Sequence, residues 1–286
     1  MRAPLFSFGL IADCQYADID DVRAGGMDRR FRASPARLAE AVDEFNRHDL
    51  AFVAHLGDLI EADLTNMPTP LKILAGLRAP LHHLLGNHDF AGALPGQVNA
   101  RDDVLGALGL DVPYYRFGLP GWRFLVLDTN EVGVIEHAPD SAGWRDGQEL
   151  LDKLTADGRI SAQPWNGTVG AAQRAWLRGE LRDAAASSNG PENVVVLAHH
   201  GIAPEHRDNL LDDREMLADL AGRPHLRAWI NGHNHAGAYA RVDGLHCLTL
   251  HGMVETATNA FALVHAYPDR LDVVGFGREP TRTLAW

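Results

Sequence analysis

Five apolar runs of this chain each end abruptly in residues that can bind a divalent metal ion. The runs span 5–12, 50–56, 80–85, 193–198 and 226–230. Each is short and bounded by polar residues, which predicts a buried strand. The polar residues that follow are Asp13, Gln15, Asp58, Asn87, His199, His233 and His235. In open α/β sheets, ligand sites form beyond the carboxyl ends of strands, so all five strand ends can meet at one site.

The segments between these strands complete an α/β pattern. Ser34 and Pro35 suit the N-cap and first position of a helix. Apolar spacing predicts further helices over 70–77 and 171–186, and a strand pair over 114–128. Helices that alternate with buried strands predict a layered α/β fold.

Residues 130–170 lack a clear period and predict a long loop with one short helix near 148–154. Because a long loop within a domain is often functional, we expect it to shape the substrate pocket. Residues 239–277 contain four more segments that are typical of strands. We find no internal repeat and no linker, which predicts a single domain over 1–286.

Composition limits the partners of this chain. Its 286 residues are 46% hydrophobic and carry a formal net charge of -12. This charge disfavours binding to nucleic acid and to anionic membranes, so an anionic substrate needs positive charge built locally at its site. The two cysteines, Cys14 and Cys247, cannot form a disulfide framework. No run approaches the ~20 apolar residues of a membrane span. We expect a cytoplasmic protein, for which a monomer is plausible.

Seven potential ligands are too many for one tetrahedral ion and suit two ions that share a carboxylate. Asp58 follows a glycine in a tight turn and is the natural bridge. The D-x-Q and H-x-H pairs each contain ligands two residues apart, which point the same way on extended backbone. Two ions about 3.5–4 Å apart can activate a water molecule and hold a phosphoryl group.

Each motif has a simpler explanation when it is taken alone. Gly, Asn and Asp are common in turns that have no function. Their occurrence together at five strand ends favours the metal site. His199 and His200 are adjacent, so their side chains should face opposite ways, and we favour His199 as the ligand. His55, His82 and His83 lie inside predicted strands and are more typical of core residues.

The motifs D-x-Q, GD, GNHD, a strand-terminal His and GHNH, in this order, resemble the calcineurin-like metallophosphoesterase superfamily. That superfamily usually has D-x-H as its first motif, and Gln15 departs from it. With segments such as IADCQYADIDD, RRFRAS, WNGTVGAAQRAWL and HGMVET, the chain is similar to the manganese-dependent ADP-ribose/CDP-alcohol diphosphatases over about 6–280. The AHHG segment and Arg30 depart from that family's pattern.

This resemblance implies a sandwich of two mixed β-sheets flanked by α-helices. It implies a hydrolase that cleaves the diphosphate bond of ADP-ribose, CDP-alcohols or related nucleoside diphosphate conjugates. The nucleophile would be metal-bound hydroxide, so no side chain would be phosphorylated. One ion would bind Asp13, Gln15, Asp58 and His235, and the other would bind Asp58, Asn87, His199 and His233.

The resemblance also implies roles for residues beside the metal ions. Mixed oxygen and nitrogen ligands suit Mn²⁺ best, with Fe or Zn²⁺ as alternatives. His88 would act as an acid or electrostatic partner for the leaving group, oriented by Asp89. Arg32 would contact a phosphate, although an arginine run is also typical of a solvated surface. Asn166 and Glu255 would contact the nucleotide or support the ligands.

Two other functions fit the same residues. The two-metal arrangement also serves a cyclic-nucleotide phosphodiesterase or a general phosphodiesterase, and the motifs do not separate these substrates. A binding scaffold that has lost catalysis is the third possibility. The sequence disfavours a scaffold because every ligand position is filled and His88 is present.

Overall fold

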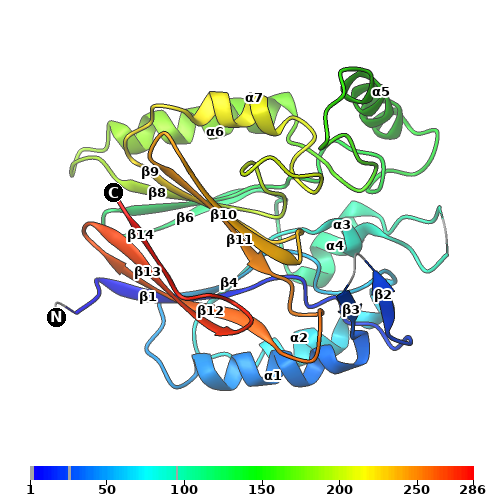
Figure 1. Cartoon of the computed structure of the whole chain (residues 1–286), viewed down its shortest axis with the longest axis horizontal. Coiled ribbons are helices and arrows are strands. Elements are labelled where there is room, and N and C mark those ends of the chain that lie inside the picture. The colour runs from blue at the N-terminus through cyan, green and yellow to red at the C-terminus, as the bar shows by residue number, and fades with distance from the viewer. Residues whose placement is uncertain (1–2, 25–26, 95) are drawn as a thin grey trace.

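A computed structural model describes residues 3–24, 27–94 and 96–286, and Figure 1 shows two large sheets packed between helices. The first sheet has the strand order β14-β13-β12-β1-β4-β5. In that order the strands span Arg282–Ala285, Arg270–Gly277, Ala260–Tyr267, Phe6–Ile11, Phe52–His55 and Leu81–His83. Strands β1, β4 and β5 are parallel, and β12, β13 and β14 pair antiparallel, so the sheet is mixed.

The second sheet has the strand order β10-β11-β9-β8-β7-β6. These strands span Ala236–Val242, Leu245–His251, Leu226–Asn231, Asn193–Ala198, Trp122–Val126 and Tyr115–Leu119. It is mixed as well, because β7, β8, β9 and β11 are parallel while β6 and β10 are antiparallel. A separate hairpin is formed by β2 (Val22–Ala24) and β3 (Met27–Arg29).

Helices cover the outer face of each sheet. In Figure 1, α1 (Ser34–Phe45) and α2 (Pro68–Leu74) lie against the first sheet, and α6 (Ala171–Ala185) and α7 (Asp213–Leu220) lie against the second. The remaining α-helices are α3 (Asn87–Phe90), α4 (Arg101–Leu108) and α5 (Ala142–Ala156). The predicted sandwich of two mixed sheets flanked by helices is confirmed. None of the helices in the described ranges combines the length and apolar character of a membrane span.

Aromatic side chains fill the space between the two sheets. Phe8 of β1 stacks on Phe52 of β4, with ring centroids 4.7 Å apart. Phe124 of β7 contacts Phe52 edge-on at 4.8 Å. All three rings are at most 2% exposed. This packing joins the two sheets in one core.

The structure differs from the sequence prediction in the 130–170 region. The predicted short helix is the 15-residue helix α5, whose buried residues include Leu151 and Leu154. Both lie in a small apolar cluster with Leu211, apart from the main core. The buried positions Gly147, Leu151 and Leu154 recur at helical spacing, and the helix begins at Ala142, before the predicted segment.

The same region contains a buried carboxyl group, Glu136, which is 5% exposed. Burial raises the pKa of Glu136 from its ordinary value of 4.5 to about 8. The unfolded chain therefore releases this proton at a lower pH than the folded chain does. Glu136 therefore lowers the free energy of unfolding progressively as the pH rises from 4.5 to about 8.

Replacing Glu136 by glutamine should remove this pH-dependent cost. We expect the free energy of unfolding of Glu136→Gln to exceed that of the wild type at pH 8.5, and the gain to vanish near pH 4.5. Urea denaturation at both pH values measures the difference. Glu149→Gln, at an exposed position of α5, controls for the loss of a negative charge. A gain of equal size at both pH values would contradict the burial of an ionisable group.

Candidate metal centre

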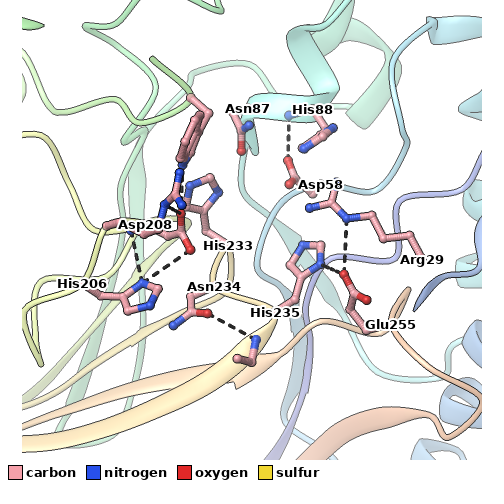
Figure 2. Close-up of a pocket in the computed structure, with 13 residues that line it drawn as sticks. Arg29, Asp58, Asn87, His88, His206, Asp208, His233, Asn234, His235 and Glu255 are labelled. Carbon is pink, nitrogen blue, oxygen red and sulfur yellow. Dashed lines mark hydrogen bonds and ion pairs between the residues drawn. The ribbon is translucent and has the colours of Figure 1, made fainter. Parts of the chain in front are cut away.

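The predicted ligands meet at the edge where both sheets end. These ligands follow strands β1, β4 and β5 of the first sheet and strands β8 and β9 of the second sheet. A pocket of about 570 Å³ opens there, and Asp58, Asn87, His88, His233 and His235 are among its lining residues (Figure 2). The structure therefore brings the predicted ligand residues together at one edge of the fold.

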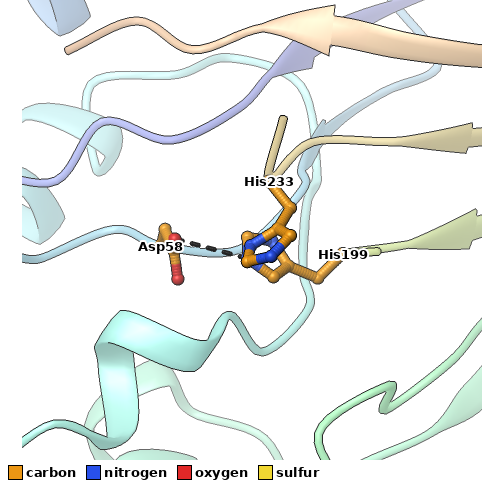
Figure 3. Close-up of side chains that lie close together, drawn as sticks. All are labelled: Asp58, His199 and His233. Carbon is orange, nitrogen blue, oxygen red and sulfur yellow. Dashed lines mark hydrogen bonds and ion pairs between the residues drawn. The ribbon is translucent and has the colours of Figure 1, made fainter. Parts of the chain in front are cut away.

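Two groups of side chains bring potential ligand atoms within 4.8 Å of one another. One group is Asp58, His199 and His233 (Figure 3), and the other is Asp13, Asp58 and His235. His199 Nε2 lies 3.3 Å from Asp58 Oδ2, and His235 Nε2 lies 3.5 Å from Asp13 Oδ1. Asp58 belongs to both groups and is fully buried.

Neighbouring groups fix the proton on the far nitrogen of each histidine. His199 Nδ1 donates to the Leu56 carbonyl at 2.8 Å, and His235 Nδ1 donates to Glu255 Oε1 at 2.8 Å. His233 Nε2 lies 2.9 Å from Asn166 Oδ1. In the neutral ring, these contacts leave the inward nitrogen with a lone pair, as metal-binding histidines require.

The orientation of Asn166 follows from its other contacts. Its Nδ2 donates to the carbonyl oxygens of Ser161 and Arg207, so Oδ1 must be the acceptor from His233. His233 Nδ1 then faces His199 Nε2 at 3.2 Å. Two lone pairs at this distance repel each other unless a proton or a cation lies between them, and a metal ion suits this position.

The amide ligands also fit a cation. Gln15 Nε2 donates to Asp58 Oδ2 at 3.1 Å, while Gln15 Oε1 is buried with no hydrogen-bond partner within the described residues. Asn87 Oδ1 lies 2.9 Å from His199 Nε2. A divalent ion would satisfy the orphan oxygen of Gln15, which otherwise carries the cost of an unpaired buried acceptor. The residues present therefore fit a metal centre.

The backbone of the ligands differs from the prediction. Asp13, Gln15, Asp58 and His233 have φ of 52°, 44°, 57° and 66°, so they are left-handed and not extended. This conformation costs about 1–3 kcal/mol at each such residue and persists where the surroundings enforce it. The backbone N–H of Gln15, for example, donates to the backbone carbonyl of Asp58 at 2.9 Å. The turns, and not strand alternation, direct these side chains inward.

Asp89 supports the Asp58 loop, and the prediction that it orients His88 is wrong. Its carboxylate accepts hydrogen bonds from the backbone amides of Gly86 and Leu59 at 2.9 Å each, and from that of Asp58 at 3.2 Å. Asp89 lies in the first turn of the short helix α3, so its side chain turns back toward these amides. Burial and then the charge of Asp58 raise the pKa of Asp89 to about 7.

Glu61 is the residue that contacts His88. Its Oε2 lies 2.8 Å from His88 Nδ1. Burial opposes protonation of His88, but the carboxylates of Asp58 and Glu61 outweigh burial and raise its pKa. The ring of His88 therefore lines the pocket with one nitrogen held by Glu61.

His200 occupies a different position from His199. Its Nδ1 lies 2.8 Å from Thr129 Oγ1, and its ring centroid lies 4.2 Å from that of His233. It therefore packs behind a ligand and is absent from both candidate ligand groups of the described chain. Thr129 follows β7, a strand end that the sequence analysis did not include, although the LDTN segment there has the same form as the others.

The three predicted substrate contacts lie in different surroundings. Asn166 and Glu255 hold His233 and His235, as described above. Arg32 forms ion pairs with Asp18 and Asp20 at 2.6 and 2.5 Å, and its side chain is 52% exposed. The pocket is instead lined by Arg29, from the same sequence motif.

Comparison with known proteins agrees with this geometry. The model of the calcineurin-like phosphoesterases matches residues 6–237. The chain belongs to the calcineurin-like phosphoesterase family. It is a metal-dependent hydrolase.

The similarity to individual relatives extends over almost the whole length of this phosphoesterase. A manganese-dependent ADP-ribose/CDP-alcohol diphosphatase of Oryza sativa subsp. japonica is 31% identical, with 96% of this chain and 92% of the relative covered. The Bos taurus protein of the same name is 29% identical over 98% of this chain and 94% of its own length. The crystal structure of a dimetal phosphatase from Danio rerio aligns with a TM-score of 0.87 at 26% identity and covers 99% of both chains.

Gly86 is required for the position of Asp58. A Cβ atom at Gly86 would lie 2.0 Å from Asp58 Oδ1 and 2.1 Å from the Asp58 backbone nitrogen. We expect Gly86→Ala to displace the carboxylate and to weaken the binding of divalent metal ions by about 10- to 100-fold, as loss of groups that support metal ligands does. Isothermal titration calorimetry measures this affinity.

The matched control is Gly106→Ala on α4, where an added Cβ meets no atom within 4 Å. This variant should retain the wild-type affinity for divalent metal ions and gain slightly in stability, because alanine is more favourable than glycine within a helix. An unchanged affinity in Gly86→Ala would show that Asp58 does not depend on this close approach.

Proposed function

We propose that this phosphoesterase cleaves the diphosphate bond of ADP-ribose, CDP-alcohols or related nucleoside diphosphate conjugates. It would release a nucleoside monophosphate and a phosphorylated remainder. The proposal is supported by relatives named manganese-dependent ADP-ribose/CDP-alcohol diphosphatase, which are similar over their full length. The observation that carries it is the pair of ligand groups that share Asp58 at the base of the pocket.

We propose that these groups hold two divalent ions, with Mn²⁺ as the preferred metal. Asp13, Gln15 and His235 would complete one site with Asp58, and Asn87, His199 and His233 would complete the other. The mixture of oxygen and nitrogen ligands, without a thiolate, suits Mn²⁺. When bound, such ions polarise a phosphoryl oxygen and lower the pKa of water.

The side chains around the ions would divide the remaining work. His88 would donate a proton to the leaving oxygen of the departing phosphate, and Glu61 would hold its ring for this transfer. The three ligand histidines would keep their orientation through Leu56, Asn166 and Glu255. Fixed rings reduce the reorganisation that the reaction requires.

A substrate panel tests the proposed function. We expect the Mn²⁺-loaded enzyme to show a kcat/KM for ADP-ribose and CDP-choline at least ~10²-fold above that for cyclic AMP. Asp58→Ala should abolish turnover of all substrates, because both proposed ions lose a ligand. Higher kcat/KM for cyclic AMP would favour the phosphodiesterase alternative, and absence of turnover with metal bound would favour a scaffold.

His88→Ala should lower kcat by ~10²-fold or more, in the range of general acid catalysis. The loss should be smaller for a substrate with an activated 4-nitrophenol leaving group, which departs without a proton. Steady-state kinetics on both substrates measures the contrast. An equal loss on both would indicate that His88 supports the site in another way.

A further inference from the structure

A diphosphate conjugate carries a second phosphate beside the one that is cleaved. With a net charge of -12, the chain must provide a local cation for that group. Two arginines line the pocket, Arg29 and Arg207. They differ in how they are held.

Backbone contacts fix Arg29 beside the metal ligands. Arg29 of β3 forms an antiparallel bridge with Glu255. On either side of it, the Arg30 amide donates to the Val254 carbonyl at 2.9 Å, and the Thr256 amide donates to the Asp28 carbonyl at 2.8 Å. The β2–β3 hairpin is therefore attached to the segment that holds His235.

The side chain of Arg29 is held as well. Its Nε lies 3.3 Å from Glu255 Oε1, the same oxygen that accepts from His235 Nδ1. Glu255 is 1% exposed, and the side chain of Arg29 is 26% exposed. The guanidinium is thus oriented before any ligand arrives, which reduces the entropy lost on binding.

The terminal nitrogens of Arg29 remain available to a ligand. Within the described residues, its side chain donates through Nε alone. Figure 2 shows the guanidinium entering from the side of Glu255 and reaching into the pocket toward Asp58 and His235. A guanidinium fork can bind a phosphate through two parallel hydrogen bonds.

The other two arginines are less suited to this role. Arg207 stacks over Trp165 at 4.6 Å, and its side chain is 57% exposed. Arg32 is neutralised by Asp18 and Asp20 and lies outside the pocket lining of the described chain.

We infer that Arg29 binds the phosphate that is not cleaved, and so selects substrates with two linked phosphates. This inference rests on the proposed function for the identity of the substrate. Arg29 takes the role that the sequence analysis gave to Arg32. The scissile phosphate lies at the metal ligands, and the second phosphate lies on the Glu255 side of the pocket.

Substrates with one and two phosphates separate this role from a structural one. We expect Arg29→Gln to lower kcat/KM for ADP-ribose by about 10- to 100-fold, the range for a hydrogen-bonded charge. The kcat/KM for bis(4-nitrophenyl) phosphate, which has a single phosphate, should change less than about threefold. Arg29→Lys should be intermediate, because it keeps the charge and loses the fork.

Arg23→Gln is the matched control, because it removes the same charge from an exposed position of the same hairpin. It should leave both activities unchanged. Mn²⁺ affinity, measured by calorimetry, should be the same in wild type and Arg29→Gln. A loss of Mn²⁺ affinity with an equal loss on both substrates would overturn the inference, since Arg29 would then act only through Glu255 and His235. A selective loss in Arg32→Gln instead would also overturn it.

Binding of inorganic pyrophosphate and phosphate to the Mn²⁺-loaded protein tests Arg29 without turnover. We expect the wild type to bind pyrophosphate more tightly than phosphate, and Arg29→Gln to reduce this preference by about tenfold or more. If nucleoside conjugates are not hydrolysed but the preference falls in Arg29→Gln, the proposed function fails and the Arg29 site stands. If they are hydrolysed and the preference is unchanged, the Arg29 site fails alone.

Discussion

The buried carboxylate of Asp58 is the constraint on which the rest of the centre depends. It belongs to both candidate ligand groups, and its backbone is left-handed with φ of 57°. The His88 amide donates to its Oδ1 at 2.8 Å, and Gly86 leaves the space that the carboxylate occupies. Burial alone would raise the pKa of Asp58, but the surrounding histidines, first His199, outweigh burial and hold it well below its ordinary value. The ionised form of Asp58 is thus stabilised by the histidines that are proposed to bind the same metal ions.

Hydrogen bonds to neighbouring residues hold the histidines of the two ligand groups in place. Leu56, Asn166 and Glu255 each hold the outer nitrogen of one histidine. Leu56 follows β4 in the first sheet, whereas Asn166 lies in the long segment between α5 and α6. The centre therefore joins the two sheets and the loop region that the sequence analysis expected to shape the pocket. Asn166 also donates to the carbonyl of Arg207, which lines the pocket, so that loop contacts the pocket lining.

Much of this arrangement could be predicted from the sequence because it depends on local patterns. Five apolar runs ending in ligands predict strands and their common edge, and the structure has β1, β4, β5, β8 and β9 in those runs. The partners of His88 and Asp89 could not be predicted, since both follow from how the loops after β4 and β5 pack together. The position of Arg29 in the pocket lining could not be predicted for the same reason. Arg29 and Arg32 lie in one motif, and only the pairing of β3 with the segment around Glu255 separates them.

By itself, the sequence determined the type of fold and the chemical nature of the site. Both follow from the order of short-range features along the chain, namely apolar runs, glycine turns and ligand residues. Only the tertiary structure decided which nitrogen of each histidine faces inward, which backbone turns are left-handed and which arginine enters the pocket. These features depend on contacts between residues as distant along the chain as Arg29 and Glu255, or Asn166 and His233. Such contacts exist only after the sheets have packed, so no local pattern in the sequence records them.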